Sequence, residues 1–212
     1  MPQVQVDVVS DVICPWCFLG KRRLDKAIAM LPEIEVEVVF RPFFLDPTIP
    51  LEGMDRHKYM ADKFGEERLK TIHDPLIAAG KEDGVPYSFD KITRTPNTLN
   101  AHRLLRWAMV AGKQRDVKEA LFMAYWNEGR DIGNAIVLSS IAAKHGMDAE
   151  KVMADLATDK DTEAVFGEVS QSQSMGITGV PTFVLARKFG VVGAQSAEVL
   201  ADAIKKAAAK AN

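Results

Sequence analysis

The chain has 212 residues, of which 27 are Lys or Arg and 29 are Asp or Glu, so its formal net charge is −2. That length suits one large domain or a small domain with a sizeable insertion, and the near-neutral charge argues against a dedicated nucleic-acid-binding protein. No apolar run approaches the roughly 20 residues of a membrane-spanning helix. The N-terminal segment MPQVQVDVVS lacks the basic region and the apolar segment of a secretory signal. We therefore expect a cytoplasmic protein that binds neither nucleic acid nor membrane.

The first fifty residues predict a strand, a helix and a second strand. Apolar and polar residues alternate over residues 4–9, which is the pattern of a half-buried strand. A helix is predicted to begin at Pro15, because a proline in the first helical position loses no hydrogen bond. Residues 34–40 alternate again and predict a second strand, which ends at Pro42 and Pro47.

The middle of the chain, from about residue 55 to residue 175, shows only helical patterns. Glycines follow most of these patterns, at the position where glycine commonly ends a helix. Pro75 lies inside the second pattern and predicts a kink or a break, and residues 84–97 predict a connecting loop. The predicted helices cover residues 55–64, 66–81, 97–112, 114–129, 134–146, 148–157 and 160–175.

Strand patterns return after residue 176. They predict a strand over residues 182–186, a hairpin turn around Lys188, a strand near 190–193 and a final amphipathic helix over 196–210. The order of elements is then strand-helix-strand, a helical block, and strand-strand-helix. This is the order of a thioredoxin-type frame with inserted helices.

The fold class predicted by this order is α/β, a thioredoxin fold with a large all-helical insertion. We expect residues 1–50 and 176–212 to form the thioredoxin-like domain. Residues 51–175 are expected to form the inserted helical domain.

Both cysteines of the chain lie in one tetrapeptide, Cys14-Pro15-Trp16-Cys17. Two cysteines exclude a disulfide-rich scaffold, and they supply only half of the ligands of a closed zinc site. Disulfide exchange needs a thiolate that attacks and a second thiol that releases the mixed disulfide. At the start of a helix, Cys14 is expected to be exposed at the positive end of the helix dipole, with Cys17 one turn further in. We therefore predict thiol–disulfide chemistry with Cys14 as the reactive thiolate.

A second signal lies downstream, where Val180-Pro181 precedes the predicted strand 182–186. The pair resembles the cis-proline loop that faces the active cysteines in thioredoxin folds. The resemblance implies a cis peptide bond facing Cys14, with the N–H and C=O of Val180 free for an extended substrate peptide. The alternative is an ordinary loop proline that opens an edge strand.

Three segments carry a more specific resemblance: DVICPWCFLGKRRLDKA, RTPNTLNAHRLLRWA and GITGVPTFVLARKFGVVGAQ. They resemble DsbA-family proteins of the FrnE type, in the same order and over nearly the whole chain. The resemblance implies a DsbA-like fold and a thiol–disulfide oxidoreductase, with Cys14 as nucleophile, Cys17 as resolving thiol and Pro181 as the cis proline. Asn97 and His102 fall in the N-T-x-x-A-H-R stretch of that family, which is NTLNAHR here.

The expected site residues are therefore of two kinds. Cys14 and Cys17 are expected to carry the chemistry. The expected substrate-binding residues are Pro15, Trp16, Asn97, His102, Val180 and Pro181. We expect no metal and no bound cofactor, and glutathione is left open as a co-substrate. The expected partners are a disulfide-containing protein or small molecule and a thiol reductant, and a homodimer is left open.

Two positions depart from the patterns of related folds. Thioredoxins commonly keep a buried acid in the first strand, and Val8 occupies that position here. We therefore expect proton transfer to and from Cys17 to use water or Asp11. Periplasmic relatives keep a histidine before the second cysteine, where Trp16 offers one N–H and no positive charge. A weaker stabilisation of the Cys14 thiolate is expected than in the strongest oxidants of the family.

The helical block is rich in large apolar side chains. Phe122, Tyr125 and Trp126 lie together near the end of one predicted helix. They predict helix packing, and a hydrophobic groove that faces the active site is the alternative.

Two other functions are left open. Kappa-class glutathione transferases and 2-hydroxychromene-2-carboxylate isomerases are similar to this chain, and they bind glutathione with a serine in place of the first cysteine. The two intact cysteines favour redox exchange over that chemistry. The other alternative is a non-catalytic scaffold or chaperone-like protein, in which the CPWC turn is structural or forms half of a zinc site.

Overall fold

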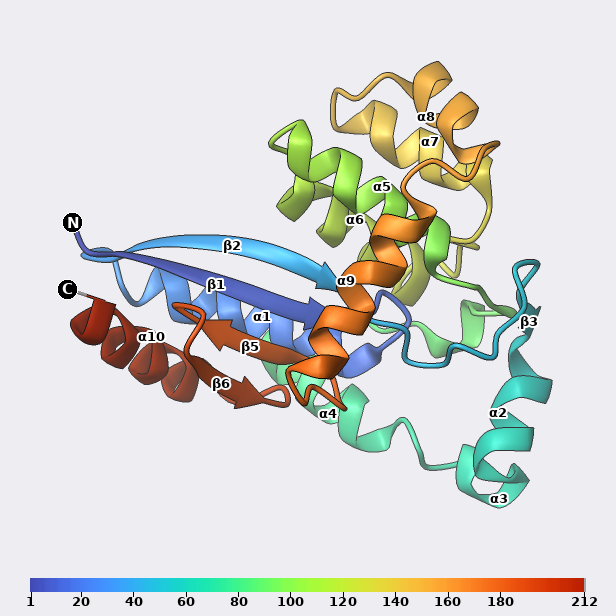
Figure 1. Cartoon of the computed structure of the whole chain (residues 1–212). Coiled ribbons are helices and arrows are strands. Elements are labelled where there is room, and N and C mark those ends of the chain that lie inside the picture. The colour runs from blue at the N-terminus through green and yellow to red at the C-terminus, as the bar shows by residue number, and fades with distance from the viewer. Residues whose placement is uncertain (212) are drawn as a thin grey trace.

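A mixed sheet of order β2-β1-β5-β6 forms the frame of the protein in the computed structural model, which describes residues 1–211 (Figure 1). The helix α1 (Pro15–Ala29) joins β1 (Gln3–Ser10) to β2 (Glu35–Pro42), and this crossover lets the two strands run parallel. The hairpin of β5 (Thr182–Leu185) and β6 (Phe189–Val192) adds antiparallel strands on the other side of β1. The predicted thioredoxin-type order is confirmed, and each strand boundary falls within two residues of its predicted place.

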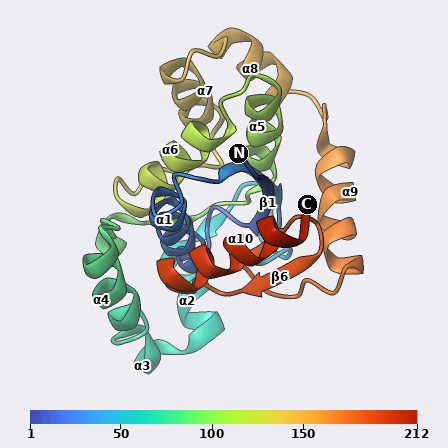
Figure 2. The same cartoon turned by 90° about the vertical axis from the view of Figure 1, so that its left-hand side faces the viewer.

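Helices cover both faces of the sheet (Figure 2). On one face, α1 and α10 (Ala197–Ala211) pack against alternate residues of β1, among them Val6 and Val8. These valines share a face because successive residues of a strand point to opposite sides. The helix α9 (Thr162–Ser174) lies on the other face and contacts β2. The last helix of the predicted insertion 51–175 is therefore packed on the sheet.

The other helices gather mainly at the end of the sheet where β1 and β2 finish (Figure 1). None of the helices within residues 1–211 is long and apolar enough to cross a membrane. Their bounds are α2 (Arg56–Phe64), α3 (Glu66–Leu69), α4 (Asp74–Asp83), α5 (Leu99–Val110), α6 (Gln114–Trp126), α7 (Ala135–Lys144) and α8 (Ala149–Leu156).

The helical pattern predicted over residues 66–81, with a kink or break at Pro75, corresponds to two helices in the structure. The chain turns after Leu69, and α4 begins at Asp74 with Pro75 in its first turn. Proline is tolerated in a first turn, where its missing N–H costs no hydrogen bond. The break predicted at Pro75 is thus confirmed.

The prediction that residues 55–175 contain only helices and loops is wrong. The predicted loop 84–97 contains a short 3-10 helix (Phe89–Lys91) and the strand β4 (Arg94–Thr95). This strand pairs antiparallel with β3 (Met54–Asp55). Strands of this length have no room for the alternation that marks a strand in a sequence.

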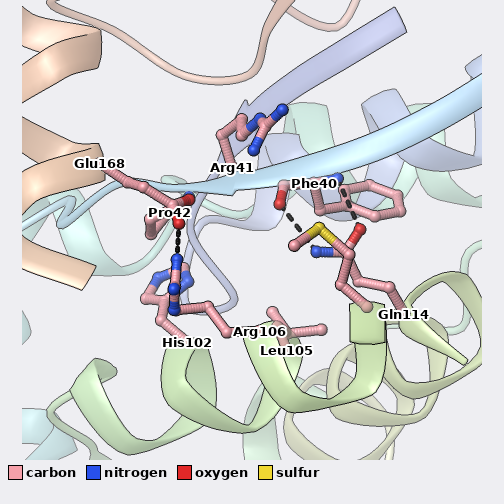
Figure 3. Close-up of a pocket in the computed structure, with 9 residues that line it drawn as sticks. Phe40, Arg41, Pro42, His102, Leu105, Arg106, Gln114 and Glu168 are labelled. Atoms are coloured by element: carbon pink, nitrogen blue, oxygen red, sulfur yellow. Dashed lines mark hydrogen bonds and ion pairs between the residues drawn. The ribbon is translucent and has the colours of Figure 1, made fainter. Parts of the chain in front are cut away.

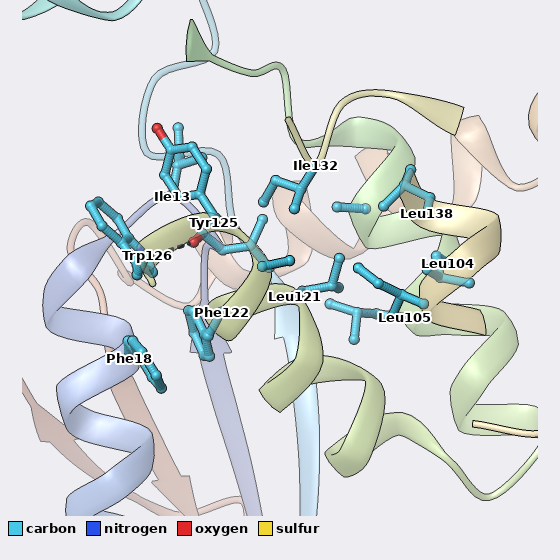
Figure 4. Close-up of a cluster of buried hydrophobic side chains, with 14 of the residues drawn as sticks. Ile13, Phe18, Leu104, Leu105, Leu121, Phe122, Tyr125, Trp126, Ile132 and Leu138 are labelled. Atoms are coloured by element: carbon cyan, nitrogen blue, oxygen red, sulfur yellow. Dashed lines mark hydrogen bonds between the residues drawn. The ribbon is translucent and has the colours of Figure 1, made fainter. Parts of the chain in front are cut away.

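A large apolar core joins the start of α1 and the turn before it to the helical part (Figure 4). Phe18 of α1 stacks on Phe122 of α6, with ring centroids 4.9 Å apart. Trp126 is fully buried, and its indole N–H donates to the carbonyl oxygen of Val12 at 3.0 Å. Full burial of a side chain of this kind contributes about 1.5–3 kcal/mol, so this core holds the start of α1 against α6. The predicted packing role of Phe122, Tyr125 and Trp126 is confirmed.

The side-chain amide of Gln114, at the start of α6, completes the edge of the sheet (Figure 3). Its Oε1 accepts a hydrogen bond from the N–H of Phe40, and its Nε2 donates to the Phe40 carbonyl oxygen, both at 2.9 Å. These backbone groups lie on an edge strand and find no partner within the sheet. An ion pair of Arg106 with Glu168 links α5 to α9 on the same side. Polar contacts therefore fix the helical part to the sheet beside the apolar core.

Candidate active site

The CPWC turn joins β1 to α1, and Cys14 is the residue immediately before the first helical turn. The N–H of Cys14 donates to the carbonyl oxygen of Asp11 at 3.3 Å, and the N–H of Cys17 donates to that of Cys14 at 3.0 Å. Pro15 opens the helix as predicted. Both cysteines are free thiols. Within the described residues, they belong to no group of three or more His, Cys, Asp or Glu side chains that could hold a metal ion.

The predicted exposure of Cys14 is wrong. Cys14 is 3% exposed and Cys17 is 1% exposed. A helix start indicates where the sulfur lies along the chain, but the segments that pack over it come from distant parts of the sequence. Cys14 nevertheless lines a cavity and Cys17 does not. Only Cys14 faces space that a substrate can enter.

The loop before β5 lies directly against Cys14. The Val180-Pro181 peptide bond is cis, and the carbonyl oxygen of Val180 accepts a hydrogen bond from Cys14 Sγ at 3.8 Å. The predicted cis bond facing Cys14 is confirmed, although the Val180 carbonyl is engaged by the thiol rather than free. Gly20 of α1 makes this approach possible, since a Cβ atom there would lie 2.9 Å from Cγ of Pro181. Sequence reasoning missed Gly20.

The environment of Cys17 keeps its thiol protonated. Burial raises the pKa of the Cys17 thiol well above its usual value, and a hydrogen bond with Cys14 raises the pKa further. The positive charge of Lys118 and a backbone hydrogen bond from Asp11 lower the pKa, but their effects are smaller. A thiol of this kind does not attack a substrate on its own.

A cavity of about 450 Å³ lies beside Cys14. Its wall is mostly apolar and is built from the CPWC turn, from α2 and α4, and from the side chain of Trp126. Three of the predicted substrate-binding residues, Pro15, Trp16 and Val180, line it. Trp16 is 41% exposed, so its ring is available to a bound molecule. A hydrophobic groove facing the active site, the alternative role for the aromatic residues of α6, is thus present. Of Phe122, Tyr125 and Trp126, Trp126 lines it.

The charged side chains that line the cavity are all basic: Arg56, Lys63 and Arg68. Lys63 pairs with Asp46 at 2.9 Å, which leaves the two arginines for a ligand. His73 also lines the cavity, and burial lowers the pKa of its imidazole, so it is neutral at pH 7. The cavity therefore favours an apolar molecule that carries negative charge.

Neither Asn97 nor His102 lines this cavity, so the substrate-binding role predicted for them needs correction. The Asn97 side chain donates to the carbonyl oxygen of Ile49 at 2.7 Å and accepts from the N–H of Leu99 at the start of α5. His102 is 2% exposed, and its Nε2 lies 3.2 Å from Oδ1 of Asp11 and 3.1 Å from the Phe43 carbonyl oxygen. Both neighbours only accept hydrogen bonds, so Nε2 carries a proton. Through these bonds Asn97 links Ile49 to the start of α5, and His102 links α5 to Asp11 and Phe43.

Lys118 is a residue that sequence reasoning missed. It lies on α6, it is fully buried, and its charge acts on Cys17. One signal could have found it. Lys118 falls on the apolar stripe of α6, next to Val117 and one turn before Leu121 and Phe122, where a surface lysine has no place.

Comparisons with known proteins agree with this geometry. A family model described as a DSBA-like thioredoxin domain matches residues 5–205. The uncharacterized protein YwbO of Bacillus subtilis is 27% identical over 205 residues, which cover 95% of this chain and 96% of that protein. The crystal structure of a probable DsbA oxidoreductase of Streptomyces coelicolor has a TM-score of 0.87 and 32% identity, over 96% of this chain and 89% of its own. A 2-hydroxychromene-2-carboxylate isomerase shares the fold, with a TM-score of 0.72 and 16% identity over 98% of this chain and 97% of its own.

Proposed function

The chain belongs to the family of DsbA-like thioredoxin domains, and we propose that it is a thiol–disulfide oxidoreductase. In this proposal Cys14 attacks the substrate and Cys17 resolves the mixed disulfide. The observation that carries it is the unequal placement of two free thiols at one helix start. Cys14 lines a cavity and lies against the Val180 carbonyl oxygen, whereas Cys17 is covered and its pKa is raised.

The exchange runs in two displacement steps. The Cys14 thiolate attacks one sulfur of a substrate disulfide, so a Cys14–substrate bond forms and the first substrate thiolate leaves. Cys17 then loses its proton and attacks Cys14 Sγ, which forms the Cys14–Cys17 disulfide and releases the second substrate thiolate. Two electrons have passed from the protein to the substrate, and a thiol reductant returns them.

The cavity supports a substrate with an apolar body and an acidic group. Trp16 offers exposed aromatic surface, and Arg56 and Arg68 offer positive charge in the cavity that Cys14 lines. The guanidinium of Arg56 lies 5.8 Å from the centre of the buried Trp126 ring, so this positive charge lies where Trp126 borders the cavity. A disulfide that carries carboxylates, either a small molecule or a segment of an acidic protein, matches this wall.

The proposal is tested by two variants that differ only in which sulfur is lost. Cys14→Ser should abolish the reduction of a protein disulfide such as that of insulin, because a hydroxyl is hardly ionised at neutral pH. Cys17→Ser should accumulate a covalent protein–substrate adduct, visible by mass spectrometry and released by excess thiol, since no resolving thiol is left. Full activity of Cys17→Ser without any adduct would contradict dithiol exchange.

A glutathione-dependent isomerase or transferase is the second candidate function. The observation that favours it is the basic lining of the cavity, because glutathione carries two carboxylates. This candidate expects Cys17→Ser to keep its activity and expects glutathione to bind without a covalent bond to Cys14. Calorimetric titration of Cys14→Ser with glutathione, followed by an assay with 2-hydroxychromene-2-carboxylate, separates the two functions.

A further inference from the structure

Lys118 is a buried lysine behind the CPWC turn, and the exchange steps described above do not use it. Its side chain is 0% exposed, and Nζ finds no hydrogen-bond partner among residues 1–211. A charged group that has lost its hydration is unfavourable unless another group compensates for the loss. A lysine in this place therefore points to a role other than stability.

Two aromatic rings hold Nζ of Lys118 in place. Nζ lies 4.9 Å from the centre of the Phe122 ring and 5.5 Å from the centre of the Phe40 ring, both within cation–π range. Phe122 is itself stacked on Phe18 of α1, and the backbone of Phe40 is bonded to Gln114. The ammonium group is therefore confined between the sheet and the start of α1.

The ionisable groups that act on Lys118 are, in decreasing order of strength, Cys17, Asp11 and Cys14. The Asp11 carboxylate is already bonded, through Oδ1 to His102 at 3.2 Å and through Oδ2 to a backbone N–H at 2.8 Å. The thiols are thus the neighbouring groups whose charge changes during disulfide exchange. Lys118 and the redox pair are coupled through charge.

The other charged side chains on the elements around Lys118 are paired with one another or exposed to solvent. On α6 itself, Glu119 binds Lys21 of α1 at 2.6 Å and also pairs with Arg22. Lys144, on α7, is exposed. Other pairs on these elements include Arg115 of α6 with Asp25, Arg41 of β2 with Asp7 and Arg106 of α5 with Glu168. These pairs provide Lys118 with no carboxylate partner.

We propose that Lys118 is the proton partner of Cys17, a role that rests on the dithiol exchange proposed above. When Cys17 attacks the Cys14–substrate disulfide, its thiol proton passes through one bridging water to the neutral amine, the Cys14–Cys17 bond forms and the substrate thiolate leaves. When the Cys14–Cys17 bond is reduced, the ammonium returns a proton to Cys17 as its sulfur leaves. Lys118 acts through Cys17, and is a positioning residue rather than a group that touches the substrate.

Two further observations support this role. Burial lowers the pKa of Lys118 to about 8, so amine and ammonium are both present near neutral pH. Burial raises the pKa of Cys17, so this thiol needs a base when it attacks. Val8 occupies the place of the buried acid that thioredoxins keep in the first strand, and the sheet itself therefore offers no such base.

The test adds one equivalent of the coloured disulfide 5,5′-dithiobis(2-nitrobenzoate) to the reduced protein. A first release of nitrothiobenzoate measures attack by Cys14, and a second release measures attack by Cys17 on the mixed disulfide. We expect Lys118→Met to keep the first release and to slow the second on the order of 100-fold at pH 7. Its pH profile should lose the inflection that the wild type shows near the lysine pKa of about 8. Lys118→Arg keeps the charge but accepts no proton, so its second release should be equally slow.

The matched control is Lys21→Met, which removes another buried lysine whose charge is met by Asp25 at 2.8 Å and by Glu119 at 2.6 Å. Both releases should be unchanged in this variant. If the second release in either Lys118 variant is as fast as in the wild type, the proposed role of Lys118 is overturned but the thiol exchange is not. Absence of the first release in the wild type instead overturns the thiol exchange.

A measurement on the wild type keeps the proposal testable if the Lys118 variants do not fold. The NMR signal of the Lys118 Cε atom is followed against pH in the reduced and in the oxidised protein. We expect the midpoint of its titration to differ between the two states, because the neighbouring thiols are lost on oxidation. Equal midpoints overturn the proposal.

Discussion

The two sulfur atoms of the CPWC turn lie one helical turn apart, but they face different regions of the molecule. On the cavity side, Cys14 borders an apolar wall with the basic residues Arg56 and Arg68, and it lies against Val180. On the core side, Cys17 is closed in by the packing of α1 on α6, with the charge of Lys118 acting on it. The same functional group therefore has two roles. Access decides which sulfur meets the substrate, and the buried charge influences when the other sulfur ionises.

The largest expected effect concerns the core side, where the buried charge of Lys118 destabilises the folded state. Burial lowers its pKa from 10.5 to about 8, which corresponds to about 3 kcal/mol. Below pH 8 the lysine is protonated in both states, and the full cost is present. Between pH 8 and pH 10.5 the unfolded chain binds more protons than the folded one, so this cost disappears as the pH rises.

Lys118→Met should therefore be more stable than the wild type by about 3 kcal/mol at pH 7, with a smaller advantage at pH 9.5. Urea unfolding of both reduced proteins at the two pH values measures this. Lys21→Met serves as the control and should be less stable than the wild type, because it breaks ion pairs with Asp25 and Glu119. A gain that does not depend on pH would show that Lys118 carries no buried charge.

On the cavity side, Arg56→Gln should lower kcat/KM for an acidic disulfide by roughly 10- to 100-fold. This is the effect expected when a charge-assisted hydrogen bond worth about 1.5–3 kcal/mol is lost. Oxidised glutathione is the acidic substrate, and hydroxyethyl disulfide is the neutral one that should be little affected. Lys58→Gln, on the same helix but paired with Asp62 in solvent, is the matched variant and should behave as the wild type. An equal decrease in kcat/KM for both disulfides would contradict the proposed preference for an acidic substrate.

At the boundary between the two sides, Gly20→Ala should destabilise the fold by about 1–3 kcal/mol, because the new Cβ atom meets Cγ of Pro181 at 2.9 Å. Gly167→Ala is the control, since nothing lies within 4 Å of a Cβ atom at that position in α9. It should stabilise the protein by about 0.5–1 kcal/mol through helix propensity. Thermal unfolding of the two variants compares them directly. A stable Gly20→Ala protein would mean that the Val180-Pro181 loop is free to move away from α1.

The smallest expected effect distinguishes the two thiols by their reactivity. Limiting iodoacetamide near neutral pH should label Cys14 at least roughly 10-fold faster than Cys17, because Cys17 does not line the cavity beside Cys14 and its pKa is raised well above the usual value. Peptide mapping by mass spectrometry gives the two rates. The Cys14→Ser protein is the control, in which Cys17 should stay slow. Predominant labelling of Cys17 would reverse the assignment of the two roles.

Local patterns in the sequence determined the frame of this protein. Alternation predicted β1 and β2, and short apolar segments around a hairpin turn predicted β5 and β6. The CPWC turn before a helix and the Val180-Pro181 pair predicted the parts of the site that meet at Cys14. These features are encoded by neighbouring residues, through strand periodicity, the proline ring and the helix start. For the same reason the break at Pro75 was predictable, and the two-residue strands β3 and β4 were not.

Only the tertiary structure decided what surrounds the two sulfur atoms. Cys14 is covered rather than exposed because segments far along the chain fold over it, and His102 bonds to Asp11 instead of lining the cavity. The apolar stripe of α6 marks Lys118 as unusual, but only the packing of α6 against β2 and the start of α1 shows that its charge lies behind Cys17. Burial and charge coupling depend on pairs of residues that are distant in sequence. A local pattern carries no information about such pairs, so the chemistry of Cys17 is a property of the folded chain.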